Sequence, residues 1–347
     1  MKFKEHIFHE NFKLNNHSFS NVDELLAFTI GFSDEIHQFL KEWFSEEDFV
    51  IVNTSGSTGI PKPIQLNKEL MKNSAIATGK FFNLKENTTA LLCLPIQYIA
   101  GKMMLIRALT LGWHLDIIES NSEPLKDTEK EYDFSAMVPL QLENSLNKIH
   151  QIKKLIVGGG VVSNQLQEKL QVISSEVFAT YGMTETITHV AVKRLNNVKI
   201  QPNYYQTLPN VTIYKDKRNC LVIDAEKVSE KIIFTNDVVD LISDTKFQWL
   251  GRFDNVINSG GIKLHPEKIE EKLSKIIENR FFVAGIPDEK LGEKLILIIE
   301  GKEQKISFED ANLSKYETPK QIYFIDKFVE TETKKIQRTK TLDFINL

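Results

Sequence analysis

Thr54-Ser-Gly-Ser-Thr-Gly-Ile-Pro-Lys-Pro63 has the densest turn chemistry of the chain, with two Gly and two Pro against 16 Gly and 10 Pro in all 347 residues. It follows an apolar run, Phe49-Val-Ile-Val-Asn53, which predicts a strand. Glycine lets backbone N–H groups turn inward, and the hydroxyls and Lys62 add donors and a positive charge, so the loop can cradle phosphate oxygens. It is not a Walker A loop, because only two residues separate Gly56 from Gly59. A polar surface turn would suit a lone Ser-Gly-Ser, but the full run favours the phosphate loop.

Short apolar runs alternate with helix-like stretches after this loop. Helices are expected over 68–82 and 101–111. Strands are expected over 89–94, 113–118, 134–138, 154–157 and 176–178. Unbroken apolar runs bounded by turn residues are typical of strands buried on both faces, as in a helix-covered sheet. The sequence therefore predicts an α/β fold with largely parallel strands.

The strands become shorter and closer together after Tyr204, which predicts a small antiparallel sheet or barrel attached to the larger unit. They are expected over 211–214, 221–223, 231–234 and 238–242. A turn-rich stretch over 251–255 is a plausible hinge, and Pro266 suits the start of a helix over 266–279. Two more strands are expected over 281–284 and 294–299. We therefore expect an ATP- and acid-binding domain over 1–253 and a small mobile α+β domain over 254–347.

Composition and charge exclude several classes of protein. With 41% hydrophobic and 26% charged residues, the chain is neither disordered nor fibrous. Its 43 Lys+Arg against 47 Asp+Glu give a net charge of −4, which argues against general nucleic-acid or anionic-membrane binding. Cys93 and Cys220 make neither a disulfide framework nor a metal-ligand spacing. The most apolar stretch, 87–101, is too short and too polar to span a bilayer, and the first ten residues lack the apolar core of a secretory signal. A soluble cytoplasmic protein is expected.

Three further segments carry candidate chemistry. Glu185 stands between two threonine hydroxyls, and such oxygen ligands suit a Mg²⁺ ion that bridges to substrate phosphates. The alternative is a helix start with its acid near the positive end of the dipole. Asp237 can accept hydrogen bonds from ribose hydroxyls and Arg252 can support the same ring, although an Asx turn and a surface Arg are the simpler interpretations of each alone. Lys335, in a polar stretch near the C-terminus, would by itself be a solvated charge.

Taken together and in this order, the four segments resemble the ATP-dependent adenylate-forming superfamily of acyl- and aryl-CoA ligases, peptide-synthetase adenylation domains and luciferases. The matches are the phosphate loop at 54–62, Tyr-Gly-x-Thr-Glu at 181–185, the hinge-containing Gly-Arg-x-Asp segment from Gly251, and Lys-Ile-x-Arg at 335–338. The resemblance implies a large domain with helix-covered sheets and a small β part, followed by a small rotating domain. It also implies an activity: a carboxylate attacks the α-phosphorus of ATP, pyrophosphate leaves, and a thiol then takes the acyl group.

The resemblance assigns roles to individual residues and implies ATP, Mg²⁺ and CoA as ligands. The residues assigned to ATP or CoA are Thr54, Ser55, Gly56, Ser57, Thr58, Gly59, Lys62, Gly158, Gly159, Gly160, Tyr181, Gly182, Asp237, Arg252, Ser259, Gly260 and Gly261. Adenylation is assigned to Lys335, with Thr184 at the α-phosphate and Glu185 at the metal. The acid pocket is assigned to Tyr98, Gly101, Met183 and His189, and the hinge to Asp254.

Three positions depart from the family pattern. Asn236 stands where the family has Gly, and we expect it to be tolerated because Asn also visits left-handed turns. Lys334 replaces the Gly before Lys335, so the choice of Lys335 rests on the Lys-Ile-x-Arg spacing. Tyr98 occupies a position where the family usually has His.

The substrate is inferred from the shortness of the chain and from the 94–104 segment. Only 53 residues precede Thr54, and with Gly158–Gly160 this resembles most the compact 2-succinylbenzoate–CoA ligases of menaquinone synthesis. His189, expected one helical turn past Glu185, would face the aromatic acid, with a core histidine as the equal alternative. The competing hypotheses are an enzyme that loads a carrier protein and a non-catalytic nucleotide-binding relative. No nucleic-acid partner or membrane insertion is expected, and a homodimer is left open.

Overall fold

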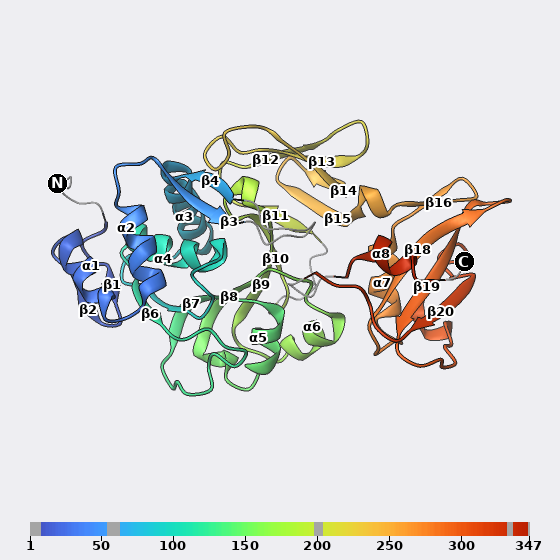
Figure 1. The fold of residues 1–347 in the computed structure, drawn as a ribbon, viewed down its shortest axis with the longest axis horizontal. Helices are drawn as coiled ribbons and strands as arrows, with labels where there is room; N and C mark the ends of the chain where they lie inside the picture. The colour runs from blue at the N-terminus through green and yellow to red at the C-terminus, as the bar shows by residue number, and fades with distance from the viewer. Residues whose placement is uncertain (1–7, 54–62, 198–203, 332–335, 346–347) are drawn as a thin grey trace.

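A path of 13 strands forms the main sheet of the computed structural model, which describes residues 8–53, 63–197, 204–331 and 336–345 (Figure 1). The parallel half runs in the order β9 (Glu176–Gly182), β8 (Ile152–Val157), β7 (Tyr132–Met137), β5 (Thr89–Leu92), β6 (His114–Ile117) and β1 (Lys13–Leu14), with β2 (His17–Ser18) antiparallel at the edge. The antiparallel half continues from β9 through β10 (His189–Arg194), β11 (Tyr205–Thr207), β15 (Lys246–Arg252), β14 (Ile233–Ser243), β13 (Cys220–Asp224) and β12 (Thr212–Lys215). The predicted α/β class with largely parallel strands in the large unit is confirmed.

Helices cover both faces of the parallel half, and the alternation of side chains along each strand decides which helices a residue meets. On β5, Leu92 belongs to the core shared with α3 (Lys68–Phe82) and α4 (Ile99–Leu111). The preceding Leu91 belongs to the core shared with α5 (Pro139–Asn144) and α6 (Asn164–Leu170). The helices expected over 68–82 and 101–111 are thus confirmed. Two helices that we did not predict, α1 (Val22–Ile30) and α2 (Asp34–Trp43), lie at the N-terminal end of the molecule (Figure 1).

The antiparallel half differs from the prediction in two ways. The strands expected over 231–234 and 238–242 are one strand, β14, whose partner residues shift at a bulge between Val238 and Val239. The residues between the two expected strands remain extended because β13 pairs with Phe234 and Val238 on either side of them and β15 pairs with Asp237. The antiparallel strands also continue the main sheet through β11 and do not form a separate unit.

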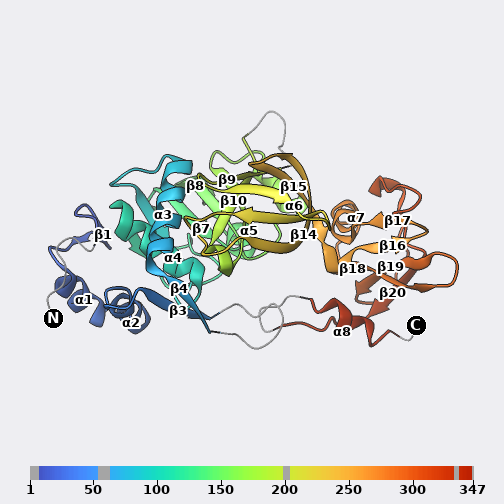
Figure 2. The ribbon, with the colours of Figure 1, turned by 90° about the horizontal axis from the view of Figure 1, so that it is seen from above.

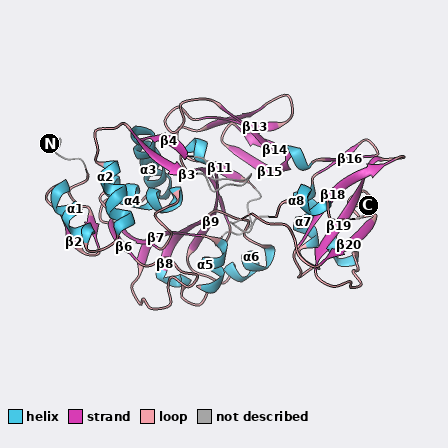
Figure 3. Cartoon of the chain, in the orientation of Figure 1, coloured by secondary structure: helices cyan, strands magenta, loops and turns pink. Residues whose placement is uncertain are grey.

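A second sheet of five strands lies at the opposite end of the molecule from α1 and α2 (Figure 2). It is formed by β16 (Ile257–Ser259), β17 (Ile262–Leu264), β18 (Phe281–Asp288), β19 (Gly292–Glu300) and β20 (Gln321–Ile325). Two short helices, α7 (Pro266–Leu273) and α8 (Arg338–Leu342), accompany it (Figure 3). The helix expected over 266–279 ends at Leu273 and is followed by turns, and Ile277 beyond it still packs in the core of this sheet.

The predicted strand before the phosphate loop is confirmed. β3 (Phe49–Asn53) pairs antiparallel with β4 (Pro63–Asn67), and the register joins Asn53 to Pro63. The loop residues 54–62 lie outside the part of the chain that the structure describes. Within the described ranges, none of the helices has the length and apolar character needed to cross a bilayer.

Candidate active site

Glycines allow the chain to pass closely at the carboxyl ends of β8 and β9. In open α/β sheets, ligands bind at this edge. Gly158, Gly159 and Gly160 follow β8, and Gly182 ends β9. A Cβ on Gly158 would lie 2.6 Å from Oγ1 of Thr180, and Gly159 has a φ of +79°, a conformation that disfavours other residues. The predicted glycine run therefore lies directly beside the predicted Tyr-Gly-x-Thr-Glu segment.

The carboxylate of Asp237 contacts two of the other predicted site residues. Tyr181 donates its hydroxyl to Oδ2 of Asp237 at 2.7 Å, and Nη1 of Arg252 lies 3.9 Å from Oδ1. Burial and then the Asp237 carboxylate raise the pKa of Tyr181 well above its usual value, so its hydroxyl stays a donor. β9 and β14 are four positions apart in the sheet, so this contact shows that the antiparallel half curls back over β9.

Trp249, which we did not predict, is a third neighbour of Asp237. Its indole Nε1 donates to Oδ1 at 3.0 Å. The register places Val239 opposite Trp249 and Asp237 opposite Arg252, so β15 carries one extra residue, Leu250, at a bulge. A bulge reverses the alternation of side chains, and it turns both Trp249 and Arg252 toward the Asp237 face. No simple sequence pattern marks such an extra residue.

The Thr184–Glu185 segment is a tight double turn. Thr184–Thr186 forms one 3₁₀ turn, and Ile187 follows with φ +64° and ψ −61°, so that Thr188 donates its N–H to the carbonyl of Thr186. This γ-turn conformation is strained for a β-branched residue, and such strain is concentrated at functional sites. The alternative of an α-helix start is thereby excluded. The turn leaves Glu185 exposed and Thr184 half-buried.

Gly182 is needed where this turn folds back on β9. It pairs with His189 across the β9–β10 hairpin. A Cβ at Gly182 would lie 2.3 Å from the carbonyl oxygen of Thr188, a contact with backbone that cannot relax by a rotamer change. Met183, assigned to the acid pocket, is half-buried and packs against the main core.

His189 is not on a helix, contrary to the prediction. It begins strand β10, because the γ-turn at Ile187 ends the short 3₁₀ turn and reverses the chain. The imidazole is buried, and burial followed by the charge of Arg107 lowers its pKa well below the usual value. Its Nδ1 lies 3.5 Å from Nη2 of Arg107, while Nε2 has no hydrogen-bond partner within the described chain.

Arg107 is a second residue that the sequence analysis missed. It is 1% exposed on α4, its Nε donates to Oγ1 of Thr78 at 3.3 Å, and burial lowers its pKa to about 9. No carboxylate of the described residues forms an ion pair with it. The available signal was a lone Arg in the apolar run Met103–Leu111, since fully buried charges are rare.

Two other residues assigned to the acid pocket lie at the start of α4. Tyr98 is the N-cap residue of the helix and is 45% exposed. Gly101 is buried, and a Cβ there would lie 2.3 Å from the carbonyl oxygen of Pro95. The glycine thus permits a close turn before the helix. Among the described residues, no contact joins the exposed Tyr98 ring to the buried Arg107–His189 pair.

The hinge assignment falls on a hydrogen-bonded junction between the two sheets. Asp254 lies in a 3₁₀ turn, and its Oδ2 is 3.3 Å from Nδ2 of Asn236 and 3.4 Å from Nη2 of Arg252. Asn236 was expected to occupy a left-handed turn in place of Gly, but it lies within the extended strand β14. Its side chain also accepts a hydrogen bond from Nη1 of Arg218 at 2.8 Å, which Gly at this position could not do.

Gly260 and Gly261 form a two-residue hairpin turn between β16 and β17. Their φ values of +58° and +81° suit a type I′ turn, and Ser259 pairs with Ile262 across it. Lys62, Lys334 and Lys335 lie outside the described residues. Immediately beyond that gap, Ile336 forms a β-bridge with Glu330.

The chemistry of the described donors fits a magnesium ion held mainly by substrate. Glu185 offers one exposed carboxylate beside the Thr184 hydroxyl. Mg²⁺ commonly takes one or two carboxylates and fills its other positions with water and phosphate oxygens. Among the described residues there is no cluster of three or more His, Cys, Asp or Glu that would form a closed protein cage.

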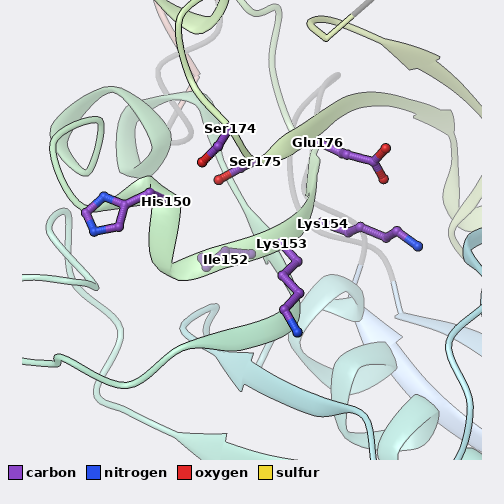
Figure 4. Close-up of a pocket in the computed structure, with 7 residues that line it drawn as sticks. All are labelled: His150, Ile152, Lys153, Lys154, Ser174, Ser175 and Glu176. Atoms are coloured by element: carbon purple, nitrogen blue, oxygen red, sulfur yellow. The ribbon is translucent and has the colours of Figure 1, made fainter.

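The hollow drawn in Figure 4 lies at the other end of the same strands. It has a volume of about 320 Å³, and its lining includes Ile152 and Glu176, the first residues of β8 and β9. Lys153 of the lining pairs with Asp133 at 2.8 Å. The hollow is therefore separate from the candidate site, which lies beyond the carboxyl ends of these strands.

Comparison with known proteins places these features in a family. Residues 9–227 match the family model described as AMP-binding enzyme. The crystal structure of an acyl-CoA synthetase (AMP-forming)/AMP-acid ligase II-like protein from Dyadobacter fermentans is 37% identical, over 89% of this chain and 93% of that one, with a TM-score of 0.62. A 2-succinylbenzoate–CoA ligase from Lactococcus lactis is 24% identical over 84% of this chain and 70% of its own length. The o-succinylbenzoate coenzyme A synthetase of Bacillus subtilis, solved with ATP and a magnesium ion, shares the fold at 18% identity, over 93% of this chain and 82% of that one, with a TM-score of 0.72.

Proposed function

The chain belongs to the family of AMP-binding enzymes, and from this premise we propose that it is an acid–CoA ligase whose acid is 2-succinylbenzoate. In the first step a carboxylate oxygen attacks the α-phosphorus of ATP, the bond to pyrophosphate breaks, and acyl-AMP forms. In the second step the CoA thiolate attacks the acyl carbon, and AMP leaves with the bonding electrons. Such chemistry depends mainly on positioning and on neutralisation of charge.

The residues near Asp237 would bind the nucleotide. Tyr181 would lie beside the adenine next to the Gly158–Gly160 run, and Asp237 with Arg252 would hold the ribose. Thr184 would hold the α-phosphate, and Glu185 would hold the magnesium ion, which neutralises phosphate charge when bound. Ser55 to Lys62 would hold the outer phosphates, and Lys335 would bridge the reacting groups. These proposed roles are supported by the order of the four motifs in the sequence.

The burial of Arg107 without a charged partner among the described residues is the observation that supports 2-succinylbenzoate as the acid. Arg107 is a fully buried cation whose two polar contacts, Thr78 and His189, are neutral. Leaving a buried charge without a partner is costly, and a ligand carboxylate would remove that cost. Because Arg107 donates to Nδ1 of His189, the imidazole proton sits on Nε2, a second buried donor that has no partner among the described residues. 2-Succinylbenzoate has two carboxylates, so one can be activated while the other pairs with Arg107.

The test is formation of CoA thioester from ATP, CoA and a panel of acids with no carrier protein present. We expect 2-succinylbenzoate to be preferred by at least ~100-fold in kcat/KM over 4-oxo-4-phenylbutanoate, which has the same skeleton without the ring carboxylate. Arg107→Gln should remove that preference and leave the poorer acid unaffected. Equal use of the two acids by the unaltered enzyme would refute the proposed substrate.

Two alternatives have different outcomes in the same assay. Acid-dependent release of pyrophosphate without any CoA thioester would favour an enzyme that loads a carrier protein. No acid-dependent release with any acid would favour a non-catalytic nucleotide-binding relative. A cytoplasmic location and a homodimer remain predictions, which fractionation and gel filtration can test.

Lys335→Ala separates the two steps. We expect it to abolish adenylation, because the positive charge is needed at the α-phosphate, and to spare thioester formation from acyl-AMP supplied ready-made. Stopped assays of each half-reaction measure this. Equal loss of both would contradict the assignment of that lysine.

A further inference from the structure

Within the described parts of the chain, each of the two oxygens of Asp237 accepts one hydrogen bond from a neutral donor. Oδ1 accepts from Nε1 of Trp249 at 3.0 Å, and Oδ2 accepts from the hydroxyl of Tyr181 at 2.7 Å. A carboxylate has about four lone-pair sites, so two remain for other donors. Asp237 is 7% exposed, and its plane is fixed from both sides by groups that cannot carry a charge near neutral pH.

Trp249 is held firmly enough to fix that plane. Its ring is half-buried against the main core. The bulge at Leu250 places its N–H on the Asp237 face, and Val239 lies directly opposite on β14. Indole offers a donor and no acceptor, so its only polar use here is the bond to Oδ1.

Arg252 would compete for the same oxygen. Its Nη1 is 3.9 Å from Oδ1, too far for a good hydrogen bond, and its side chain is 47% exposed. Without the indole N–H, the Tyr181 hydroxyl alone would hold the carboxylate, and Oδ1 could turn about the Cβ–Cγ bond toward the guanidinium. The lone pairs left over would then point in a different direction, and Arg252 would no longer be available to a ligand.

We propose that Trp249 is a positioning residue for the nucleotide, which keeps the free lone pairs of Asp237 aimed at the two hydroxyls of the ribose and keeps Arg252 apart from that carboxylate. This inference rests on the proposed function, in which Asp237 binds the ribose. Trp249 would act through its bond to Asp237, so we expect its effect on recognition of the sugar and not on the chemical step.

Trp249→Phe tests the inference in the full chain, because it keeps an aromatic ring and removes the N–H. Binding of ATP, 2′-deoxy-ATP and 3′-deoxy-ATP is measured by calorimetry. A hydrogen bond to a charged group is worth about tenfold in affinity, so we expect ATP to bind the variant roughly tenfold more weakly. The affinity for each deoxy analogue should fall less, so that the preference for ATP falls to within about twofold.

Trp43→Phe is the matched control, because Trp43 lies in α2 away from the site, and it should leave all affinities unchanged.

The outcomes separate the inference from the proposed function. If the unaltered chain does not bind ATP, or binds all three nucleotides equally, the proposed ribose site fails and the inference with it. If the unaltered chain prefers ATP and Trp249→Phe keeps that preference, or loses all three affinities equally, Trp249 has no positioning role.

Should Trp249→Phe fail to fold, a chain with Trp43→Phe and Trp113→Phe leaves Trp249 as its one tryptophan. Its fluorescence should then respond to ATP more strongly than to either deoxy analogue, and an equal response would refute the proposal.

Discussion

Burial sets the chemistry of the Arg107–His189 pair. Both side chains lie inside the main unit, and burial lowers the pKa of each. With a pKa of about 9, Arg107 keeps its charge near neutral pH, while His189 stays neutral. The pair therefore presents one cation and one neutral donor, which suits a carboxylate better than two cations would, because two adjacent charges would repel each other.

The lowered pKa of His189 predicts a pH dependence of stability. In the unfolded chain histidine binds a proton below about pH 6.5, whereas buried His189 does not. Stability should therefore fall as the pH is lowered through that value, with a slope approaching ~1.4 kcal/mol per pH unit from this residue. His189→Asn should flatten the curve of unfolding free energy against pH between 7.5 and 5.5, measured by urea denaturation.

A control separates this residue from the other histidines. Burial also lowers the pKa of His114 and His265, so some slope should persist in the variant. His150→Asn, at an exposed position, should leave the slope unchanged. Parallel curves for the unaltered chain and His189→Asn would show that His189 does not resist protonation.

Motifs predicted some residues of the site and not others. Tyr181, Asp237 and Arg252 come from separate motifs, and the structure brings their side chains together, while their roles stay predictions. Trp249 was missed because its contact depends on one extra residue in β15, which no residue type marks. Arg107 had a signal, a charge inside an apolar helix, but the sequence alone does not show whether such a charge is buried or at the surface.

The start of β14 and the turn after β15, to which the hinge is assigned, form one polar cluster. Asn236 links Arg218 to Asp254, and the guanidinium of Arg218 also lies 5.4 Å from the ring centre of Phe253. Rotation at Asp254 would have to break the Asn236 bond. The departure from Gly at this position thus supplies a contact that stabilises the orientation seen here.

Asn236→Gly should release this contact. The lost bonds are largely exposed and are worth about 1 kcal/mol or less, so we expect effects of about two- to fivefold. Thioester formation from enzyme-bound acyl-AMP, which requires the proposed rotation, should become faster. ATP–pyrophosphate exchange should stay within about twofold, because the Asp237 contacts are intact. Rapid-quench measurement of the two half-reactions tests this.

Asn236→Asp is the companion variant. It keeps an acceptor for Arg218 but replaces the donor to Asp254 by a second carboxylate, so it should also speed the thioester step. If both half-reactions change equally in the two variants, or neither changes, the link to the hinge is wrong.

At the scale of elements, local pattern predicted α3 and β3 because their signals are local. Asn67 caps α3 and Asn83 ends it in a left-handed conformation, and both residue types mark helix ends. The end of α7 was misplaced because Ser274 to Asn279 remains compatible with helix, and the apolar spacing of Ile269, Leu273 and Ile277 continues past Leu273, where the structure has turns. Whether residues 233–243 form one strand or two depends on the pairing of β14 with β13 and β15. A local sequence pattern carries no information about that pairing.

A polar contact joins α6 of the main unit to α7, which accompanies the small sheet. Nδ2 of Asn164, the first residue of α6, donates to the carbonyl oxygen of Glu271 at 2.7 Å and to Oγ of Ser274 at 3.0 Å. The hydrophobic clusters of the small sheet contain only residues from 257 onward, so neither core depends on the other. Polar contacts of this kind allow one unit to move relative to the other, as the proposed rotation of residues 254–347 requires.

A disulfide across this contact would hold the orientation seen here. Asn164→Cys with Ser274→Cys brings two thiols close together, since Nδ2 of Asn164 lies 3.0 Å from Oγ of Ser274 and the sulfur at position 164 would lie one bond short of that nitrogen. The native Cys93 and Cys220 are buried, and burial raises the pKa of Cys93 to about 12, so neither should compete during oxidation. If the two steps need different orientations, the oxidised protein should keep one half-reaction and lose overall turnover by at least ~10-fold, and a reductant should restore it. The reduced double variant controls for the substitutions themselves. Full turnover by protein shown by mass spectrometry to be cross-linked would mean that α6 and α7 stay together through both steps, and the rotation would have to be abandoned.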